Sequence, residues 1–523
     1  MAEHRALFKS TAVISAMTFI SRIFGYIRDA VIFIFLGATG STDAFFVAFR
    51  IPNFLRRLFA EGAFSQAFVP VLSEYKEKHS EQELKSLVNH VSGVLGLILL
   101  LITIVGVILA PLLIYVFAPG FIDDPERFDL AGQMLRITFP YILFISLTAL
   151  SAGILNTFNQ FAVPAFTPTF LNLALIAATL WLAPMFEQPV VALAWGVFIA
   201  GIAQLLFQIP FLSRLGLLPK FSLQGANEGV KKIARLMLPA IFGSSVVQIN
   251  LLINTLIASF LAVGSISWLY ISDRFVELPL AIFGVATATT ILPRLSRQFI
   301  NQSSTGFNQT LEWAIKLSVF IALPSAIGLI LLAKPILTSL IQYREFTALD
   351  TQMASLSLMT YALGLPAFIL IKVLAPGFYS RQDTKTPVKI GVFAMLCNIF
   401  LTLILLWVWS KYKLPGPHAA LALSTSISAY INASLLFIML RRSADFTLRF
   451  GWVKYLVQIA LASLIMLIVL TQILPLNTQW LEWSGFIRVT ALLGFMLLGA
   501  VLYIGALAIL GLRKKDFALQ PAE

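Results

Sequence analysis

Long apolar stretches separated by short polar segments run through the whole chain. A helix needs about 20 mostly apolar residues to cross a bilayer core. We therefore predict an all-α integral membrane protein with about fourteen transmembrane helices, counted by that length. The expected spans are residues 11–36, 42–73, 88–117, 131–157, 163–184, 189–213, 232–261, 266–297, 311–334, 352–378, 386–410, 417–440, 454–474 and 487–511.

Composition and charge fit a membrane protein. The 523 residues are 59% hydrophobic and only 12% charged, whereas a soluble chain carries roughly 25% charged residues. The formal net charge of +13 would suggest a nucleic-acid partner in a soluble protein, but here it follows from charged loops on one membrane side, so no nucleic acid is expected. The single cysteine, Cys397, excludes a disulfide framework and a thiolate metal site.

The distribution of basic residues predicts the orientation. If the N-terminus is cytoplasmic, 23 of the 37 basic residues fall in cytoplasmic segments and seven in outside segments. The positive-inside rule then places both termini in the cytoplasm of a multi-pass protein of the bacterial inner membrane. The apolar run after the basic N-terminus is interrupted by Arg22 and Arg28, so we expect a retained helix and not a signal peptide.

An internal repeat divides the predicted helices into two sets of six. The segment Phe68–Ser73 is echoed by Ile291–Ser296, and Asn156–Gln160 by Phe378–Gln382, both about 223 residues later. An even number of helices between the copies predicts parallel repeats related by an axis along the membrane normal. The expected parts are an N-terminal lobe at 1–221, a C-terminal lobe at 222–445, and helices thirteen and fourteen at 446–523.

Seven basic residues lie inside the predicted apolar helices. An arginine at the bilayer centre costs roughly 2.5–3.5 kcal/mol even on the lenient insertion scale. Such side chains must line a water-filled cavity or be paired. The seven are Arg22, Arg28, Arg50, Arg56, Arg57, Arg274 and Lys372.

The first predicted helix has a polar stripe that we expect to face a central cleft. At 100° per residue the stripe covers an arc of about 120°. The alternative is a local Arg28–Asp29 pair with charged ends that snorkel, which leaves Arg22 unexplained. The stripe consists of Thr18, Ser21, Arg22, Gly25, Arg28 and Asp29.

The second predicted helix is also striped. Pro52 can kink it, so the spacing leaves open whether Arg56 or Arg57 enters the cavity. Arg57 and Glu61 are as well explained by a structural ion pair at i,i+4. The stripe on a straight helix consists of Asp43, Arg50, Asn53, Arg57 and Glu61.

The eighth predicted helix carries Asp273, Arg274 and Glu277 about two turns inside the membrane. A structural salt bridge and a gate between the lobes are both consistent with this charged turn.

Arginine is informative because its planar fork binds phosphate through two hydrogen bonds and keeps its charge. A cleft with three or four arginines fits an anionic, lipid-linked diphosphate, whereas a multidrug cation antiporter would need an acidic cavity. A flippase for another polyprenyl-linked oligosaccharide would share the clamp. The chain has no acidic metal-binding loop or nucleotide-binding glycine motif outside the helices, so we expect no enzyme and no cofactor. Coupling to the membrane potential or to a monovalent ion stays open.

Four stretches closely resemble the MurJ (MviN) family of lipid II flippases: Ser21–Ala30, Thr42–Asn53, Phe59–Phe68 and Ala375–Asp383. The resemblance covers essentially the whole chain. It implies the multidrug/oligosaccharidyl-lipid/polysaccharide exporter fold. It also implies movement of lipid II, an undecaprenyl-diphosphate-linked peptidoglycan precursor, from the cytoplasmic to the periplasmic leaflet by alternating access.

The same resemblance implies roles for individual residues. By motif position the substrate-binding arginines of the family fall on Arg22, Arg28, Arg56 and Arg274, and an important aspartate falls on Asp43. Together with Glu61, Asp273 and Glu277, Asp43 is expected to form gating ion pairs. The seventh helix offers asparagines where the sodium site of some family members has a carboxylate, so no metal ligands are assigned. Helices thirteen and fourteen are expected to offer a groove for the lipid tail.

Overall fold

The computed structural model describes residues 2–57, 64–223, 227–443, 446 and 451–513. Across these ranges the chain is α-helical, with short 3-10 and π-helical turns and without any strand. By its internal contacts the chain divides into two compact units, Met1–Ser267 and Trp268–Glu523. The prediction of an all-α fold is therefore confirmed.

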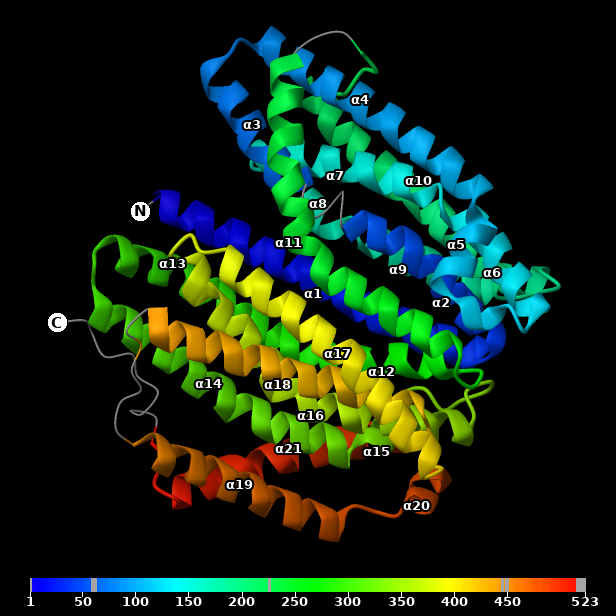
Figure 1. Cartoon of the computed structure of the whole chain (residues 1–523), viewed down its shortest axis with the longest axis vertical. Helices are drawn as coiled ribbons and strands as arrows, with labels where there is room; N and C mark the ends of the chain where they lie inside the picture. The colour runs from blue at the N-terminus through cyan, green and yellow to red at the C-terminus, as the bar shows by residue number, and fades with distance from the viewer. Residues whose placement is uncertain (1, 58–63, 224–226, 444–445, 447–450, 514–523) are drawn as a thin grey trace. The chain divides into compact units, whose positions relative to one another are not determined.

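The first unit is built from long helices and several short ones (Figure 1). They are α1 (Ala2–Leu36), α2 (Gly40–Leu55), α3 (Ser65–Lys78), α4 (Glu81–Ile108), α5 (Ala110–Phe117), η2 (Pro119–Phe121), α6 (Pro125–Thr138), α7 (Tyr141–Thr157), α8 (Ala162–Phe166), α9 (Thr169–Ala177), η3 (Ala178–Leu182), η4 (Ala183–Met185), α10 (Val191–Arg214) and α11 (Asn227–Ser259).

The remaining helices lie in the second unit, except that α12 begins just before the boundary. They are α12 (Ser265–Pro279), η5 (Leu280–Val285), α13 (Ala286–Ile300), α14 (Ser304–Leu331), α15 (Ala333–Leu340), α16 (Ala348–Tyr379), α17 (Lys385–Lys411), α18 (His418–Ser443), α19 (Trp452–Ile473), α20 (Asn477–Glu482) and α21 (Gly485–Ile509).

Eleven helical segments of the described chain are long and apolar enough to cross a membrane, and each coincides with a predicted span. They are Glu81–Ile108, Pro125–Thr157, Ala162–Met185, Val191–Arg214, Ser265–Ile300, Ser304–Leu331, Ala348–Tyr379, Lys385–Lys411, His418–Arg442, Trp452–Ile473 and Gly485–Ile509. The other three predicted spans correspond to α1, to α2 with α3, and to α11, whose apolar part is the shorter Gln248–Ser259. The total of fourteen stays a prediction.

Helix starts follow from local capping chemistry. Ser80 and Glu83 form a capping box at the start of α4, where the Ser80 N–H donates to the Glu83 carboxylate at 2.9 Å. Thr347 and Asp350 repeat the arrangement at α16. Each box satisfies backbone N–H groups that have no partner within the helix, so the polar loop residues determine where these long apolar helices begin.

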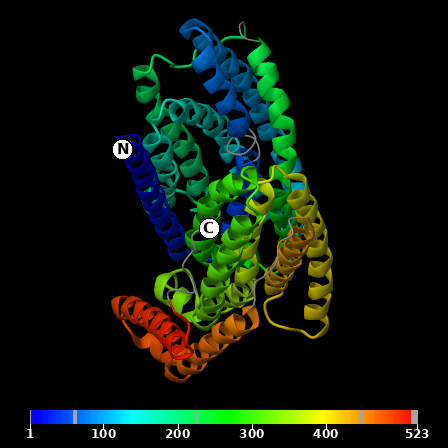
Figure 2. The same ribbon diagram turned by 90° about the vertical axis from the view of Figure 1, so that its left-hand side faces the viewer.

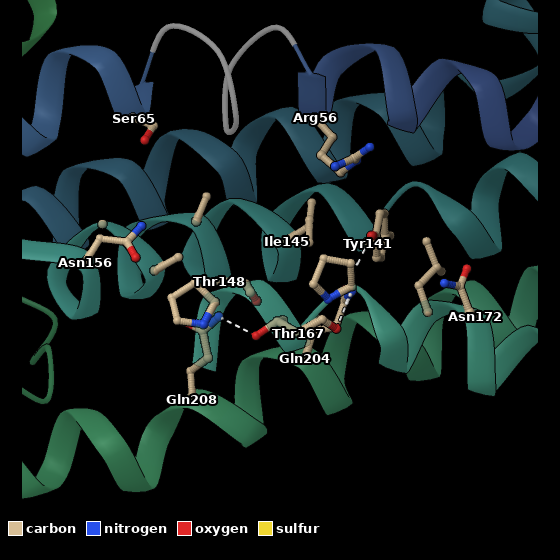
Figure 3. Close-up of a pocket in the computed structure, with 16 residues that line it drawn as sticks. Arg56, Ser65, Tyr141, Ile145, Thr148, Asn156, Thr167, Asn172, Gln204 and Gln208 are labelled. Carbon is tan, nitrogen blue, oxygen red and sulfur yellow. Dashed lines mark hydrogen bonds between the residues drawn. The ribbon is translucent and has the colours of Figure 1, made fainter. Parts of the chain in front are cut away.

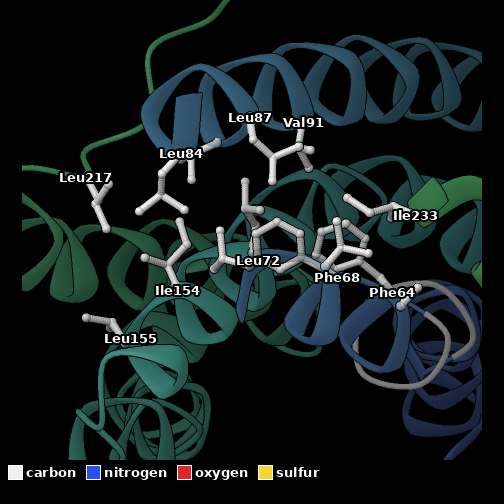
Figure 4. Packing of buried hydrophobic residues seen from close by; sticks show 14 of the residues in the cluster. Phe64, Phe68, Leu72, Leu84, Leu87, Val91, Ile154, Leu155, Leu217 and Ile233 are labelled. Atoms are coloured by element: carbon white, nitrogen blue, oxygen red, sulfur yellow. The ribbon is translucent and has the colours of Figure 1, made fainter. Parts of the chain in front are cut away.

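One hydrophobic core cluster of the first unit lies among α3, α4, α7, the C-terminal end of α10 and α11 (Figure 4). Adding 223 to the numbers of eight of its residues gives eight core residues of the second unit. Phe68, Leu72, Leu84, Val88, Val91, Leu150, Leu155 and Leu217 correspond to Ile291, Leu295, Phe307, Leu311, Ala314, Val373, Phe378 and Leu440. The two units therefore bury the same pattern of positions, which supports the predicted repeat.

Two loops repeat the same backbone turn. Asn159 and Gln382, 223 residues apart, both have φ of 60°. The N–H of the residue after each one donates to the carbonyl five positions back, Gln160 to Leu155 at 2.8 Å and Asp383 to Phe378 at 3.1 Å. Left-handed residues with this 6→1 hydrogen bond are a common way to end a helix. The two segments that are similar in sequence therefore also have the same backbone conformation at this turn.

Helix α11 packs on the first unit, although the predicted boundary at residue 222 assigns it to the second lobe. Its contacts are with α2, α3, α4, α5 and η2, and the green α11 runs beside the blue helices in Figure 2. At its N-terminal end Lys232 pairs with Glu74 at 2.5 Å, and this hydrogen bond and charge hold the pKa of Glu74 below its ordinary value. The compact units follow packing, whereas the predicted boundary follows the repeat.

The last two long helices form a separate layer of the second unit. α19 and α21 pack on each other, and α19 also packs on α14 (Figures 1 and 2). Polar bonds reinforce this layer. Trp452 Nε1 donates to Glu312 Oε1 at 3.0 Å, and the Tyr503 hydroxyl donates to the Phe320 carbonyl at 2.8 Å. The predicted terminal helices are therefore attached to the second unit mainly through α14.

A glycine where η2 meets α11 gives a test of this packing. A Cβ on Gly120 would lie 2.3 Å from the Ser259 carbonyl oxygen, and backbone atoms cannot move away easily. We expect Gly120→Ala to destabilise the protein by about 1–3 kcal/mol, as overpacking does, measured as a lower melting temperature in detergent.

Gly132→Ala is the matched control, because nothing lies within 4 Å of its Cβ position in α6 and alanine favours a helix. An unchanged melting temperature for Gly120→Ala, or an equal fall in both variants, would contradict the contact.

Candidate functional site

The polar stripe of α1 is partly buried within the first unit. Arg28 and Asp29 are 5% and 2% exposed and form an ion pair with a distance of 2.6 Å between Arg28 Nη2 and Asp29 Oδ1. Arg28 Nη1 also donates to Asn172 Oδ1 on α9 at 3.0 Å, and Asn172 Nδ2 donates to the Ser21 carbonyl at 2.9 Å. The local pair that the sequence offered as an alternative is therefore present, and an amide of α9 extends it.

Arg22 lies on the same stripe but in different surroundings. Its side chain is exposed, and among the described residues it has no hydrogen bond or ion pair. Arg28 follows six positions later, which places the two side chains about 120° apart around α1, at the two edges of the stripe, and about 9 Å apart along the helix axis. The local pair accounts for Arg28 alone and leaves the Arg22 cation available to a ligand.

Helix α2 ends at Leu55, and Arg56 and Arg57 follow in a π-helical turn. The wide turn changes the phase that a straight helix would have, and η5 shows π-helical geometry about 223 residues later. π-Turns inside helices occur frequently at functional sites. Arg56 lines a pocket and its Nε donates to Asn53 Oδ1 at 2.9 Å, whereas Arg57 is not part of the pocket wall. Glu61, the predicted partner of Arg57, lies outside the described residues.

Asp43 is 1% exposed and is held by the turn that leads into α12. Its carboxylate accepts hydrogen bonds from the Gly264 N–H at 2.7 Å, the Ser267 N–H at 2.8 Å and the Ser267 hydroxyl at 2.7 Å. Donors at the start of a helix favour a negative charge. In this conformation the described hydrogen-bond partners of Asp43 include no arginine, so its predicted gating role stays a prediction.

Arg274, on α12 in the second unit, makes a local ion pair. Its Nη1 lies 2.8 Å from Glu277 Oε2, and its guanidinium lies 5.7 Å from the centre of the Tyr270 ring. Both members of the pair are partly exposed, so solvent screens the interaction. Asp273 is the adjacent residue and is half-buried. The structural salt bridge is thus observed, while the predicted meeting of Arg274 with the arginines of the first unit stays a prediction.

The first unit contains an open polar pocket of about 280 Å³ lined by helices α7 to α10, the end of α2 and the start of α3 (Figure 3). Among the described residues its wall contains one charged side chain, Arg56, and no carboxylate. The polar lining residues are Arg56, Ser65, Tyr141, Thr148, Asn156, Thr167, Asn172, Gln204 and Gln208. Asn172 also binds Arg28, so the pocket connects two of the four predicted arginines.

The amides of this pocket are not among the residues predicted from the sequence. Gln204 and Gln208 are 2% and 0% exposed, and their i,i+4 spacing on α10 puts them on one helix face. Two glutamines at this spacing in an otherwise apolar helix indicate a buried polar site. They carry no charge, so a search for charged residues within apolar helices does not find them. No group of three or more His, Cys, Asp or Glu side chains is placed to hold a metal ion within the described part of the chain.

Known proteins resemble this chain over nearly its whole length. The family profile described as "Lipid II flippase MurJ" matches residues 32–491. A relative from Vibrio cholerae named "Probable lipid II flippase MurJ" is 46% identical over 519 residues, covering 98% of each chain. The "Lipid II flippase MurJ" of Burkholderia cenocepacia is 40% identical over 98% of this chain and 99% of its own.

Solved structures agree with these relatives. "Lipid II flippase MurJ, inward closed conformation" aligns with a TM-score of 0.80 at 32% identity, covering 95% of this chain and 98% of the other. An inward-facing multidrug resistance MATE family transporter of the MOP superfamily aligns with a TM-score of 0.68 at 15% identity, covering 83% and 98%. That second likeness concerns the fold alone.

Apolar helices of membrane-spanning length, a polar pocket and the buried Arg28 indicate a multi-pass membrane protein, and its fold is that of transporters of the MOP superfamily. Within this class, the profile match and the full-length relatives give a specific assignment. The chain belongs to the MurJ family of lipid II flippases.

The three hydrogen bonds of Asp43 give a test of its structural role. Asp43→Asn replaces one acceptor oxygen by an NH₂ group, so in either amide orientation a buried donor of Gly264 or Ser267 loses its acceptor. An unsatisfied buried group costs about 1–3 kcal/mol, and we expect a lower melting temperature in detergent.

Ser267→Ala removes one of the three bonds and leaves both backbone donors satisfied, so it should lower the melting temperature less. If Asp43→Asn melts like the wild type, the carboxylate does not hold this turn.

Proposed function

We propose that this protein moves lipid II from the cytoplasmic to the periplasmic leaflet of the bacterial inner membrane by alternating access. The observation that carries the proposal is membership of the MurJ family over nearly the full chain. Parallel repeats of helices are the usual framework of transporters that rock one half against the other, and the shared core positions of the two units agree with such a framework.

The polar groups of the first unit favour an anionic substrate. Arg22 is exposed and without a partner among the described residues. Arg56 lines the pocket, and none of the described wall residues is a carboxylate. Guanidinium groups bind phosphate oxygens through paired, charge-assisted hydrogen bonds. A multidrug cation antiporter would require acidic side chains at this place, so it is the weaker candidate.

The proposed binding step uses the arginines in two ways. Arg22 and Arg56 offer guanidinium groups to the diphosphate, while Arg28 is already oriented by Asp29 and Asn172. A side chain that is held in place before binding loses less conformational entropy when the ligand arrives. By its position in the family motif, Arg274 is a further candidate to bind the diphosphate. Asp43 would hold the turn before α12 in the conformation described here.

The orientation and the driving force belong to the same proposal. With both termini in the cytoplasm, the basic loops face the negative interior. The membrane potential then favours outward movement of a diphosphate by about 2.3 kcal/mol per elementary charge per 100 mV. Coupling to this potential or to a monovalent ion would supply the energy without a bound cofactor.

Arg22→Gln tests the function with little effect on folding, because the Arg22 side chain is exposed and has no partner among the described residues. In cells that depend on this protein, we expect the variant to lower at least tenfold the lipid II that an externally added cleaving enzyme can reach, since a charge-assisted hydrogen bond is worth about 1.5–3 kcal/mol.

Arg297→Gln, at an exposed site near the end of α13, is the control and should leave accessibility unchanged. Equal melting temperatures would show that both variants fold. Wild-type accessibility of lipid II without any functional protein would overturn the proposed function itself.

Arg274→Lys tests whether the fork geometry matters or charge alone suffices. Lysine keeps the charge and can still pair with Glu277, but it cannot bind two phosphate oxygens in one plane. We expect roughly a tenfold loss of lipid II movement in the same assay, the equivalent of about 1.4 kcal/mol. Full activity of Arg274→Lys would mean that the residue acts only as a positive charge.

A further inference from the structure

The hydrogen bonds of the pocket in the first unit fix the orientation of one amide. The Thr167 hydroxyl donates its hydrogen to the Val163 carbonyl at 2.8 Å, so it can only accept from Gln208 at 2.9 Å. The NH₂ group of Gln208 must therefore face Thr167, and the carbonyl oxygen Oε1 is the other end. Figure 3 shows this Gln208–Thr167 bond at the pocket wall.

The Gln208 Oε1 atom is buried and has no hydrogen-bond partner among the described residues. The neighbouring Gln204 has a partner at each end of its amide, since its Nε2 donates to the Thr167 carbonyl at 3.3 Å and its Oε1 accepts from the Tyr141 hydroxyl at 3.3 Å. Asn156 also lines the pocket, and within the described structure its side chain has no hydrogen bond. Buried polar groups normally have a partner, so this wall lacks a donor that a ligand could supply.

The chemistry of the wall excludes several kinds of ligand. A metal cation would meet no carboxylate among the described wall residues and would be repelled by Arg56. An anion inside the pocket would be attracted by one cation but repelled by the carbonyl oxygens of the amide side chains. An acyl chain would displace water from the amides and offer them no hydrogen bonds, which costs free energy. A neutral group that carries hydroxyl and amide functions satisfies donors and acceptors alike. The volume of about 280 Å³ lies just below the range of about 300–1,000 Å³ typical of small-molecule sites, which suits one sugar ring.

We propose that this pocket binds an N-acylated sugar of the transported head group, with Gln208 Oε1 accepting a hydrogen bond from it and Arg56 facing the linked diphosphate. The proposal rests on the proposed function and adds to it a recognition site for the neutral part of the substrate. Asn172 forms part of the wall and also binds Arg28. An occupied pocket is thereby connected to the arginine that α1 holds in place.

The test compares two lipids on the full-length protein in nanodiscs: lipid II, and undecaprenyl diphosphate, which has no sugar. We expect the wild type to bind lipid II more tightly. Gln208→Met keeps the length of the side chain and removes its hydrogen bonds, so it should weaken lipid II binding about tenfold, the effect of one lost hydrogen bond to a buried group. Binding of undecaprenyl diphosphate should change less than about twofold, within the scatter expected for a residue that makes no contact.

Gln298→Met is a closely matched control in the second unit. Gln298 Nε2 also donates to a threonine hydroxyl, that of Thr310, at 3.0 Å, and its Oε1 is likewise buried without a partner among the described residues. It lies outside the pocket wall, so this variant should bind both lipids like the wild type. Asn156→Ala is a second pocket variant, which breaks no side-chain hydrogen bond of the described structure and should show the same selective loss.

The outcomes separate this proposal from the proposed function. Selective loss of lipid II binding in Gln208→Met or Asn156→Ala supports the sugar pocket. Equal weakening of both lipids, no weakening in either pocket variant, or a wild type that binds the two lipids equally overturns the pocket and leaves the flippase function standing. A wild type that binds neither lipid overturns both. If Gln208→Met fails to fold, Asn156→Ala alone decides.

Discussion

Ionic and polar groups inside hydrocarbon must find partners within the protein, and this constraint shapes the first unit. Arg28 is buried on α1 and receives its partners from its own helix and from α9, through Asp29 and Asn172. Without these bonds the charge would carry a desolvation penalty of several kcal/mol. The same requirement explains why the amides of α10 lie on one face and bond to the neighbouring helices.

The two units share a hydrophobic framework, but the second unit does not repeat the polar groups Arg28, Gln204 and Gln208 of the first. Eight core positions recur after 223 residues, and the loops at Asn159 and Gln382 recur with the same backbone turn. The residues 223 positions after Arg28, Gln204 and Gln208 are apolar: Leu251, Ile427 and Ile431. Core packing requires only side chains of suitable volume and apolarity, so the two units can differ in sequence there. A binding site requires particular functional groups, and these three are present in the first unit alone.

Much of the fold could be predicted from the sequence, because hydrophobic length is a local property. The predicted span 189–213 became α10 at Val191–Arg214, and 163–184 became the segment Ala162–Met185. The site was less accessible. Charge led to Arg28 and Asp43, but the partners of Asp43 are backbone groups, which no residue pattern reveals. The uncharged Gln208 matters only through its position beside Thr167, 41 residues away.

By itself the sequence determined the all-helical membrane class, the repeat and the family, because apolar length, spacing and long motifs are written along the chain. Helical spacing left open which of two adjacent arginines enters the cavity, and the tertiary structure places Arg56 in the pocket wall, since a π-helical turn rotates Arg56 and Arg57 away from ideal helix phase. The tertiary structure also decided that α11 packs with the first unit. The orientation of Arg56 and the packing of α11 both depend on contacts between segments that are distant in the sequence. Such contacts are determined by how the helices pack in space and cannot be read from the order of residues.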